Sequence, residues 1–255
     1  MRFIQKKVTS GEVLSGCFCV MGSSISVEIV GHSGLDYVII DMEHGAGDFG
    51  ILYQQLQTAA STRVAALVRV TSNEKTLFKR ALDAGADGIV VPFVNSANEA
   101  ASAVAAMRYP PAGVRGVASS VRATTFGNNF AEYQAASDKE LLTVVQIETI
   151  QGVEAASDIA AVDGVDVLFV GPNDLSFSLG LPRQFDHPDF IDALIRVSSS
   201  AKAAGKASGI LLQSADDVPA AIERGYTFIS LGNDGGYVGT GARAAAIAIS
   251  RYQSN

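Results

Sequence analysis

Short apolar segments recur along the chain, and each is followed by a longer stretch with the spacing of a helix. Several of these segments are almost continuously apolar, which is typical of parallel strands that are covered on both faces. The pattern predicts eight strands, at residues 16–20, 37–41, 64–70, 88–92, 143–148, 166–171, 208–213 and 227–232.

The stretches between the predicted strands carry the signals of amphipathic helices. In residues 72–85, Leu77 and Ala81 repeat at helical spacing, and Gly85 follows as a stop signal. Eight strands alternating with helices predict an α/β protein with the fold of a (β/α)8 TIM barrel, in a single domain over residues 1–255. A doubly wound open sheet is the alternative. Comparable helical stretches lie at 23–34, 96–110 and 216–225.

The segment 109–140 breaks this regular spacing between the predicted fourth and fifth strands. It begins near two prolines and is rich in Gly, Asn and Ser. A connection of this length in a compact domain often has a function of its own. We interpret it as a long βα excursion that forms an active-site loop or a contact between subunits.

Composition narrows the class of protein. The formal net charge is −7 and no basic run occurs, which argues against a nucleic-acid partner or an anionic membrane surface. No apolar stretch reaches the roughly 18 residues of a membrane helix, and the charged start is unlike a signal peptide, so we expect a cytoplasmic protein. A charged fraction of only 18% suggests surface buried in a homo-oligomer. Cys17 and Cys19 are expected to be reduced core residues.

Ionisable and amide side chains occur where the predicted strands end. In a TIM barrel, the C-terminal ends of the strands form the face that carries the active site. Residues two apart on a strand share a face, so the pair on the fifth strand is expected to point the same way. The strands would bring the following residues to one rim: Asp41, Glu43, His44, Arg69, Gln146, Glu148 and Asp174.

Glu148 and Asp174 are candidate metal ligands. Two carboxylates on neighbouring strand ends, without cysteine and with little histidine nearby, suit Mg²⁺ or Mn²⁺ completed by water and substrate oxygens. The alternative is that both are solvated rim acids, with Asp174 capping a helix. Spacing alone leaves both interpretations open.

Arg69 and His44 are the candidate reactive side chains. Arg69 is the only charge of an apolar strand, so it needs an anionic partner, either a structural acid such as Asp41 or a substrate oxyanion. His44 could act as a general base near neutral pH if Asp41 or Asp83 fixed its tautomer. The alternative for His44 is a loop histidine in water.

The segment "GPNDLS" (171–176) is of interest for its backbone. Gly171 and Pro172 make a sharp exit from the sixth strand, and the N–H groups of Asn173 to Leu175 then begin a helix, an arrangement that can bind a carboxylate. A nucleotide-binding loop is the weaker interpretation, because neither of the usual glycine-rich patterns occurs here.

These residues lie in segments that together resemble the HpcH/HpaI aldolase family of class II pyruvate aldolases, within the phosphoenolpyruvate/pyruvate-binding barrel superfamily. The histidine of "DMEHG" favours this branch over citrate-lyase β-type proteins, in which another acid is expected at that position. The resemblance is strongest in "DYVIIDMEHG" (36–45), "RALDAGADGIVVPFVNSANEA" (80–100), "VVQIETIQGVEAASDIAAVDGVDVLFVGPNDLS" (144–176) and "GILL" (209–212).

The resemblance implies a metal-dependent aldolase that cleaves a 4-hydroxy-2-oxoacid to pyruvate and an aldehyde. Glu148 and Asp174 would hold Mg²⁺, Mn²⁺ or Co²⁺, which would chelate the keto and carboxylate oxygens of pyruvate, and no organic cofactor would be needed. Arg69 would stabilise the enolate, and Gln146 would orient metal ligands or water. His44, with Asp41 or Asp83, would move protons at the aldehyde end.

The remaining implied contacts concern substrate binding and assembly. The backbone from Gly171 through Pro172 and Asn173 to Asp174 would bind the pyruvate carboxylate, and Leu212 would shape the pocket. The family assembles as homohexamers, trimers of dimers that exchange C-terminal helices. The segment 117–129 would carry the acceptor-side contacts; there Arg122 would bind a distal acid of the substrate or form a subunit salt bridge.

Two other functions use the same residues or none of them. Decarboxylation of oxaloacetate would pass through the same enolate. A non-catalytic barrel would not need the combination of Glu148, Asp174, Arg69 and His44. No lysine lies at the predicted strand ends, which argues against a Schiff-base mechanism. The aldehyde, the preferred metal and the role of Glu43 stay undetermined by the sequence.

Overall fold

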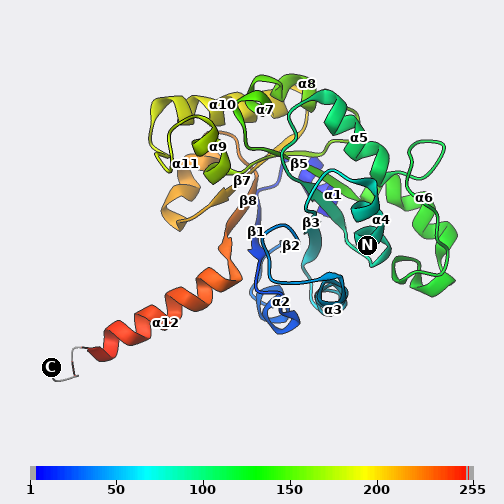
Figure 1. Ribbon diagram of the computed structural model, residues 1–255, viewed down its shortest axis with the longest axis horizontal. Helices are drawn as coiled ribbons and strands as arrows, with labels where there is room; N and C mark the ends of the chain where they lie inside the picture. Colours follow the sequence, from blue (N-terminus) through cyan, green and yellow to red (C-terminus); the bar gives the residue numbers. More distant parts are fainter. Residues whose placement is uncertain (1–3, 251, 253–255) are drawn as a thin grey trace.

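The computed structural model describes residues 4–250 and 252, and its centre is a closed barrel of eight parallel strands. Each strand pairs with the next along the chain, and β8 pairs with β1 (Figure 1). The predicted TIM barrel is therefore confirmed, and the open-sheet alternative is wrong. The strands are β1 (Leu14–Cys19), β2 (Tyr37–Asp41), β3 (Ala65–Arg69), β4 (Gly88–Val91), β5 (Leu142–Ile147), β6 (Val167–Val170), β7 (Ala207–Leu212) and β8 (Phe228–Asn233).

Alternate residues of each strand fill the barrel, and the others face the surrounding helices. Inside, the rings of Tyr37 and Phe228 stack with their centroids 3.9 Å apart, and the Tyr37 hydroxyl shares a hydrogen bond with Ser230. Gly16 makes room for this stack, since a Cβ at that position would lie 2.3 Å from the Tyr37 ring. The barrel interior is therefore a packed core that leaves space for a ligand only at its ends.

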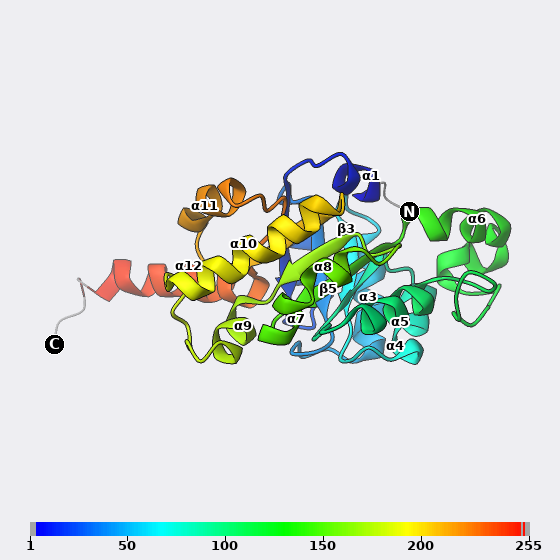
Figure 2. The same ribbon diagram turned by 90° about the horizontal axis from the view of Figure 1, so that it is seen from above.

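Helices cover the outside of the barrel (Figures 1 and 2). The stretch predicted at 72–85 forms a shorter helix, which buries Phe78, Ala81 and Leu82. The short helix α1 (Ile4–Thr9) packs Ile4 and Val8 against the interior cluster. The covering helices are α2 (Ser24–Gly31), α3 (Phe49–Ala59), α4 (Lys75–Asp83), α5 (Ala97–Met107), α7 (Ile150–Glu154), α8 (Ala156–Ala160), α9 (Pro172–Ser178), α10 (Pro188–Ala203), η2 (Ala215–Asp217) and α11 (Val218–Glu223).

The excursion between β4 and β5 is folded. It contains the 3₁₀ helix η1 (Arg122–Gly127) and helix α6 (Phe130–Glu140). Arg115 anchors it, because the fully buried guanidinium pairs with Asp83 at 2.9 Å and donates to the Tyr133 hydroxyl at 3.1 Å. An unpaired guanidinium would be costly at this depth, so these contacts hold the excursion against α4.

The last helix, α12 (Asp234–Ser250), projects away from the barrel (Figures 1 and 2). Its first residue is buried, and Asp234 accepts hydrogen bonds from the backbone of Val20 at 2.8 Å and from the Ser26 hydroxyl at 2.6 Å. Beyond this anchor, Val238 and Ile247 are exposed. In the described part of the chain, no helix is both long and apolar enough to span a bilayer. The cytoplasmic location stays a prediction.

Candidate active site

Alternation along the strands brings the predicted polar residues to the mouth of the barrel. Asp41 and Arg69 are direct partners in the register of β2 and β3. Leu142 and Val144 point into the barrel on β5, so Gln146 and Glu148 follow on the same face. The predicted convergence of strand ends is found in the structure.

A cavity of about 310 Å³ opens at this mouth. Every predicted metal- or substrate-binding residue except Leu212 lines it. Apolar side chains from three strands complete its walls. The lining residues are Phe18, His44, Arg69, Gln146, Glu148, Phe169, Gly171, Pro172, Asn173, Asp174 and Leu211.

Arg69 is held by two carboxylates. Its Nε and Nη2 donate to the two oxygens of Asp41 at 2.9 and 2.6 Å, and its Nη1 lies 3.2 Å from Glu43 Oε2. The ring of Phe18 lies 4.8 Å from the guanidinium carbon. Burial alone would lower the pKa of Arg69, but the contacts with Asp41 and Glu43 raise that pKa above its ordinary value. Arg69 is therefore a permanent positive charge in the cavity.

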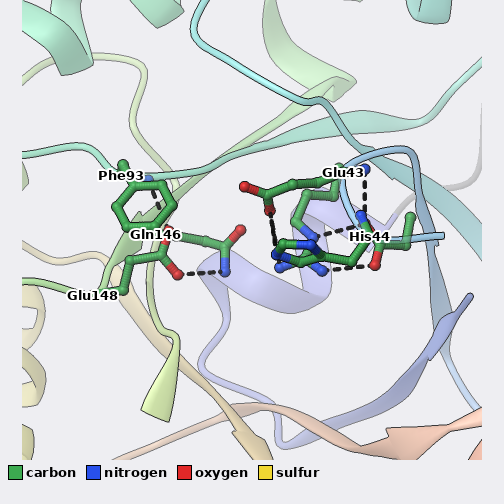
Figure 3. Close-up of polar contacts among 7 residues, drawn as sticks. Glu43, His44, Phe93, Gln146 and Glu148 are labelled. Carbon is green, nitrogen blue, oxygen red and sulfur yellow. Dashed lines mark hydrogen bonds and ion pairs between the residues drawn. The ribbon is translucent and has the colours of Figure 1, made fainter. Parts of the chain in front are cut away.

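Glu148 is a buried carboxylate with neutral partners (Figure 3). Its Oε1 accepts the backbone N–H of Phe93 at 2.8 Å, and its Oε2 accepts from Gln146 Nε2 at 3.2 Å. Burial raises the pKa of Glu148 to about 7; the Phe93 hydrogen bond opposes this, and the negative charge of Asp174 adds to it. The ionised form of Glu148 therefore lacks enough nearby positive charge.

The backbone around Glu148 is shaped to contain it. Phe93 has a φ of 51°, an unusual conformation for a bulky residue, and this turns its N–H toward the carboxylate. Gly171 passes close on the other side, where a Cβ would lie 2.3 Å from Glu148 Oε2. Gly171 also precedes α9, whose first turn places Asn173 and Asp174 in the cavity wall. The N–H of Leu175 bonds to Gly171 within the helix, so it is not a free donor.

These residues fit a hard divalent cation. Around the cavity, the carboxylates of Asp41, Glu43 and Glu148 lie near the Arg69 guanidinium, and the carboxylate of Asp174 lies near Glu148. A buried oxygen with no hydrogen-bond partner among the described residues, Gln146 Oε1, lies beside them. No group of three or more His, Cys, Asp or Glu residues that could hold a metal is found in the described chain. A cation here would use two protein carboxylates, with water and substrate oxygens as further ligands.

Comparisons with known proteins identify the relatives of this chain. The family model described as "HpcH/HpaI aldolase/citrate lyase" matches residues 14–240. This chain belongs to that family. A 5-keto-4-deoxy-D-glucarate aldolase of Klebsiella pneumoniae is 42% identical over 223 residues, which cover 88% of this chain and 87% of the relative. The predictions of the family and of an aldolase enzyme are confirmed.

Solved structures of the family have the same overall fold. A HpcH/HpaI aldolase/citrate lyase family protein of Burkholderia cenocepacia J2315 superposes with a TM-score of 0.94 at 35% identity, over 98% of this chain and 99% of that one. The HpcH/HpaI aldolase of Desulfitobacterium hafniense DCB-2 gives a TM-score of 0.91 at 31% identity, over 98% and 97% of the two chains.

The family histidine lies near a different acid from those predicted. Oδ1 of Asp41 accepts the backbone N–H groups of Glu43 and His44, at 3.0 and 3.3 Å, and also Arg69 Nε, while Oδ2 accepts Arg69 Nη2. Asp83 is paired with Arg115 in the excursion. Among the described residues of one chain, neither acid forms a hydrogen bond or ion pair with the His44 ring, and the predicted orienting role stays a prediction. The carboxylate within ion-pair range of His44 is Glu43, whose Oε2 lies 3.9 Å from Nε2.

The structure places Leu212 on the face of β7 that points away from the cavity, which corrects the prediction. Leu211 lines the cavity, whereas Leu212 packs into the cluster between the barrel and the helices. Because strand side chains alternate, an error of one residue moves a side chain to the opposite face. The residue that shapes this side of the family cavity is therefore Leu211.

Arg122 lies away from the cavity of its own chain. Its guanidinium donates to the carbonyls of Ala84 and Leu56, at 2.7 and 3.2 Å. These carbonyls belong to the C-terminal ends of α4 and α3, where a positive charge is favourable. Within one chain, Arg122 therefore supports the scaffold, and its contact with a distal acid of the substrate stays a prediction.

Two residues of the candidate site have roles that the sequence does not predict. Phe93 acts through its backbone N–H, for which its side chain gives no signal. Glu43 precedes His44 in the sequence, but its contact with Arg69 depends on how the loop after β2 is folded (Figure 3).

Proposed function

We propose that this protein is a divalent-metal-dependent aldolase that cleaves a 4-hydroxy-2-oxoacid to pyruvate and an aldehyde, and catalyses the reverse addition. The observation that carries the proposal is that Glu148 and Arg69 line the same cavity. Glu148 is a buried carboxylate whose hydrogen-bond partners are neutral, and Arg69 is permanently charged. Such a cavity suits a reaction in which negative charge develops on a substrate oxygen.

Our first candidate substrate is 5-keto-4-deoxy-D-glucarate, the compound in the names of the curated relatives. Numbered from its other carboxylate, this acid has a keto group at C2, a deoxy carbon at C3 and a hydroxyl at C4. It is therefore a 4-hydroxy-2-oxoacid, and its cleavage between C3 and C4 would release pyruvate.

The cleavage assigns tasks to four side chains of the cavity. The C4 hydroxyl loses its proton, the C3–C4 electron pair moves into an enolate, and the charge collects on the C2 oxygen. Arg69 would stabilise that oxygen, and His44 would accept the hydroxyl proton. A divalent cation held by Glu148 and Asp174 would supply further positive charge beside the developing oxyanion. Protonation at C3 then gives the methyl group of pyruvate.

The backbone at the start of α9 would bind the substrate carboxylate. Pro172 has no N–H, so the available donors in this turn are those of Asn173 and Asp174, at the positive end of the helix. Gly171 allows close approach because it carries no side chain. This arrangement would orient the C2 oxygen of the substrate toward Arg69.

Assembly is a further part of the proposal. We propose a homohexamer, a trimer of dimers, in which α12 of one chain packs on a second copy. The exposed apolar residues of α12 and the exposed Ile25 and Ile29 of α2, each 68% accessible, support this. Exposed apolar side chains that gather into a patch usually mark a protein interface.

The metal requirement can be tested directly. Pyruvate release from 5-keto-4-deoxy-D-glucarate and from oxaloacetate is measured after exhaustive chelation with EDTA, and again after Mn²⁺, Mg²⁺ or Co²⁺ is restored. We expect chelation to abolish release, a metal to restore it in the wild type, and Glu148→Gln to stay inactive with metal present.

The matched control for that test is Glu132→Gln, on the exposed face of α6. It makes the same chemical change and should behave as the wild type. Activity that survives complete chelation would contradict the metal-dependent mechanism. Release from oxaloacetate alone would identify the protein as a decarboxylase with the same site.

A further inference from the structure

Glu43 is an acid at the mouth of the barrel to which the proposed mechanism gives no task. Its side chain is only 11% exposed, although it lies in the loop after β2. Burial raises the pKa of this carboxyl, and the positive charge of Arg69 opposes the shift. A buried acid in a polar loop is costly unless specific partners hold it.

The partners of Glu43 are the two side chains that would act on the substrate. The same oxygen, Oε2, lies 3.2 Å from Arg69 Nη1 and 3.9 Å from His44 Nε2. The shorter distance is an ion pair between two charged groups. The longer one is ion-pair range, so its attraction grows when the imidazole accepts a proton.

Glu43 completes the restraint of Arg69. Asp41 holds one edge of the guanidinium through Nε and Nη2, and Phe18 covers a face. Glu43 holds Nη1, the nitrogen that Asp41 leaves free. A guanidinium has five N–H bonds, of which Asp41 takes two, and Glu43 pairs with the nitrogen that carries two of the other three. Glu43 therefore helps to set the direction in which the free N–H bonds point.

We propose that Glu43 is a positioning residue that couples Arg69 to His44 through one carboxylate oxygen. It aims the free N–H bonds of Arg69 at the developing oxyanion, and its charge stabilises the imidazolium that forms when His44 takes the hydroxyl proton. With Nε2 of His44 turned to Glu43, the nitrogen that accepts the proton is Nδ1. The inference rests on the proposed aldolase function. It identifies Glu43 as the acid that stabilises the protonated form of His44.

The proposal predicts a loss in turnover with little change in substrate binding. Glu43→Gln keeps the shape of the side chain and removes its charge, so kcat should fall about tenfold to a hundredfold, the usual cost of losing a charge-assisted contact. KM should change less than threefold. Glu43→Asp should recover part of kcat. The control is Glu132→Gln, which should have wild-type kcat.

A double-mutant comparison separates positioning from a structural role. Pyruvate methyl-proton exchange in deuterated water is measured for Glu43→Gln in the wild-type and Arg69→Lys backgrounds. If Glu43 acts through Arg69, the substitution slows exchange about tenfold or more in the first background and less than threefold in the second. Equal factors in both backgrounds, or a wild-type kcat for Glu43→Gln, would overturn the proposal.

A measurement without turnover keeps this test independent of the proposed reaction. The rate at which phenylglyoxal modifies Arg69 is followed by mass spectrometry of peptides. Release of Nη1 should make Arg69 react several-fold faster in Glu43→Gln and not in Glu132→Gln; an unchanged rate contradicts the restraint. Absence of both exchange and cleavage in the wild-type protein would instead overturn the proposed function, while the modification rate still decides the contact.

Discussion

At the scale of single residues, Asp41 and Glu148 show how the same chemical group acquires different properties at the barrel mouth. Both are buried carboxylates near the ends of strands. Asp41 meets a guanidinium with both oxygens, whereas Glu148 accepts hydrogen bonds only from a backbone N–H and an amide. Glu148 is therefore the group whose charge most needs a cation.

This difference predicts how stability depends on pH in the metal-free protein. The pKa of Glu148 is about 7 in the folded state, against about 4.5 when unfolded, so the folded state binds the extra proton between these values. Its stabilising contribution is fully present below about pH 4.5 and is lost as the pH rises through 7, by about 3 kcal/mol in total.

Urea denaturation in EDTA from pH 5 to 8 measures this effect. The free energy of unfolding of the wild type should fall relative to that of Glu148→Gln, and most of the relative fall should be complete by about pH 8. Mn²⁺ should reverse the trend, because its affinity rises as Glu148 ionises. Parallel curves for the two proteins would show that Glu148 ionises normally in the fold.

At the scale of elements, neighbouring residues of β7 face opposite sides of the strand, one toward the cavity and one toward the core. Leu211 faces the ligand space, and Leu212 is buried between the barrel and its helices. Leu212→Ala should destabilise the fold by about 2–4 kcal/mol through the cavity that it leaves, with nearly unchanged kcat/KM. Leu211→Ala should cost less stability and alter KM or the preference among aldehydes.

Thermal or urea unfolding and steady-state kinetics of the two alanine variants form a matched pair. Each variant serves as the control for the other, because the chemical change is identical and only the face of the strand differs. The reverse assignment, with Leu212 controlling KM and Leu211 controlling stability, would show that the register of β7 is shifted by one residue.

The excursion between β4 and β5 shows where composition misleads at this scale. Its Gly, Asn and Ser content suggests an open loop, yet it contains η1 and α6. The order comes from partners distant in the sequence: Arg115 reaches Asp83 on α4. Arg122 reaches Leu56 at the end of α3 and Ala84 at the end of α4. Such contacts are invisible to a pattern read over neighbouring residues.

At the scale of the whole molecule, α12 is the element that a single chain leaves without a complete packing surface (Figure 1). A chain that ends at Gly239 keeps the buried anchor Asp234 and loses most of the projecting helix. If α12 packs on a second copy, this truncation should reduce the molar mass measured by light scattering. Activity should fall with it if partner chains complete the site.

A point variant tests the same interface from its other side. Ile29→Asp on α2 places a charge on the exposed apolar face and should also lower the molar mass, whereas Glu132→Gln should not. A truncated chain with the mass of the full-length assembly would show that α12 does not hold the copies together.

Local patterns were enough to predict the fold and most of the rim. Eight apolar segments separated by helical stretches define a barrel, since strand period and helix period are properties of neighbouring residues. The same period places Gln146 and Glu148 on one face, and the family motifs contain Asp41 and Asp174. The sequence by itself therefore determined the architecture, the family and the end of the barrel at which the candidate site lies.

Only the tertiary structure decided which of those groups are partners. Asp41 holds Arg69, Asp83 holds Arg115, and Glu43 lies between Arg69 and His44. These pairings depend on the closing of the barrel, the direction of each side chain and the fold of the loops, which join residues far apart in sequence. The charges in the sequence do not show which acid pairs with which base, because each pairing depends on distances that exist only after the chain has folded.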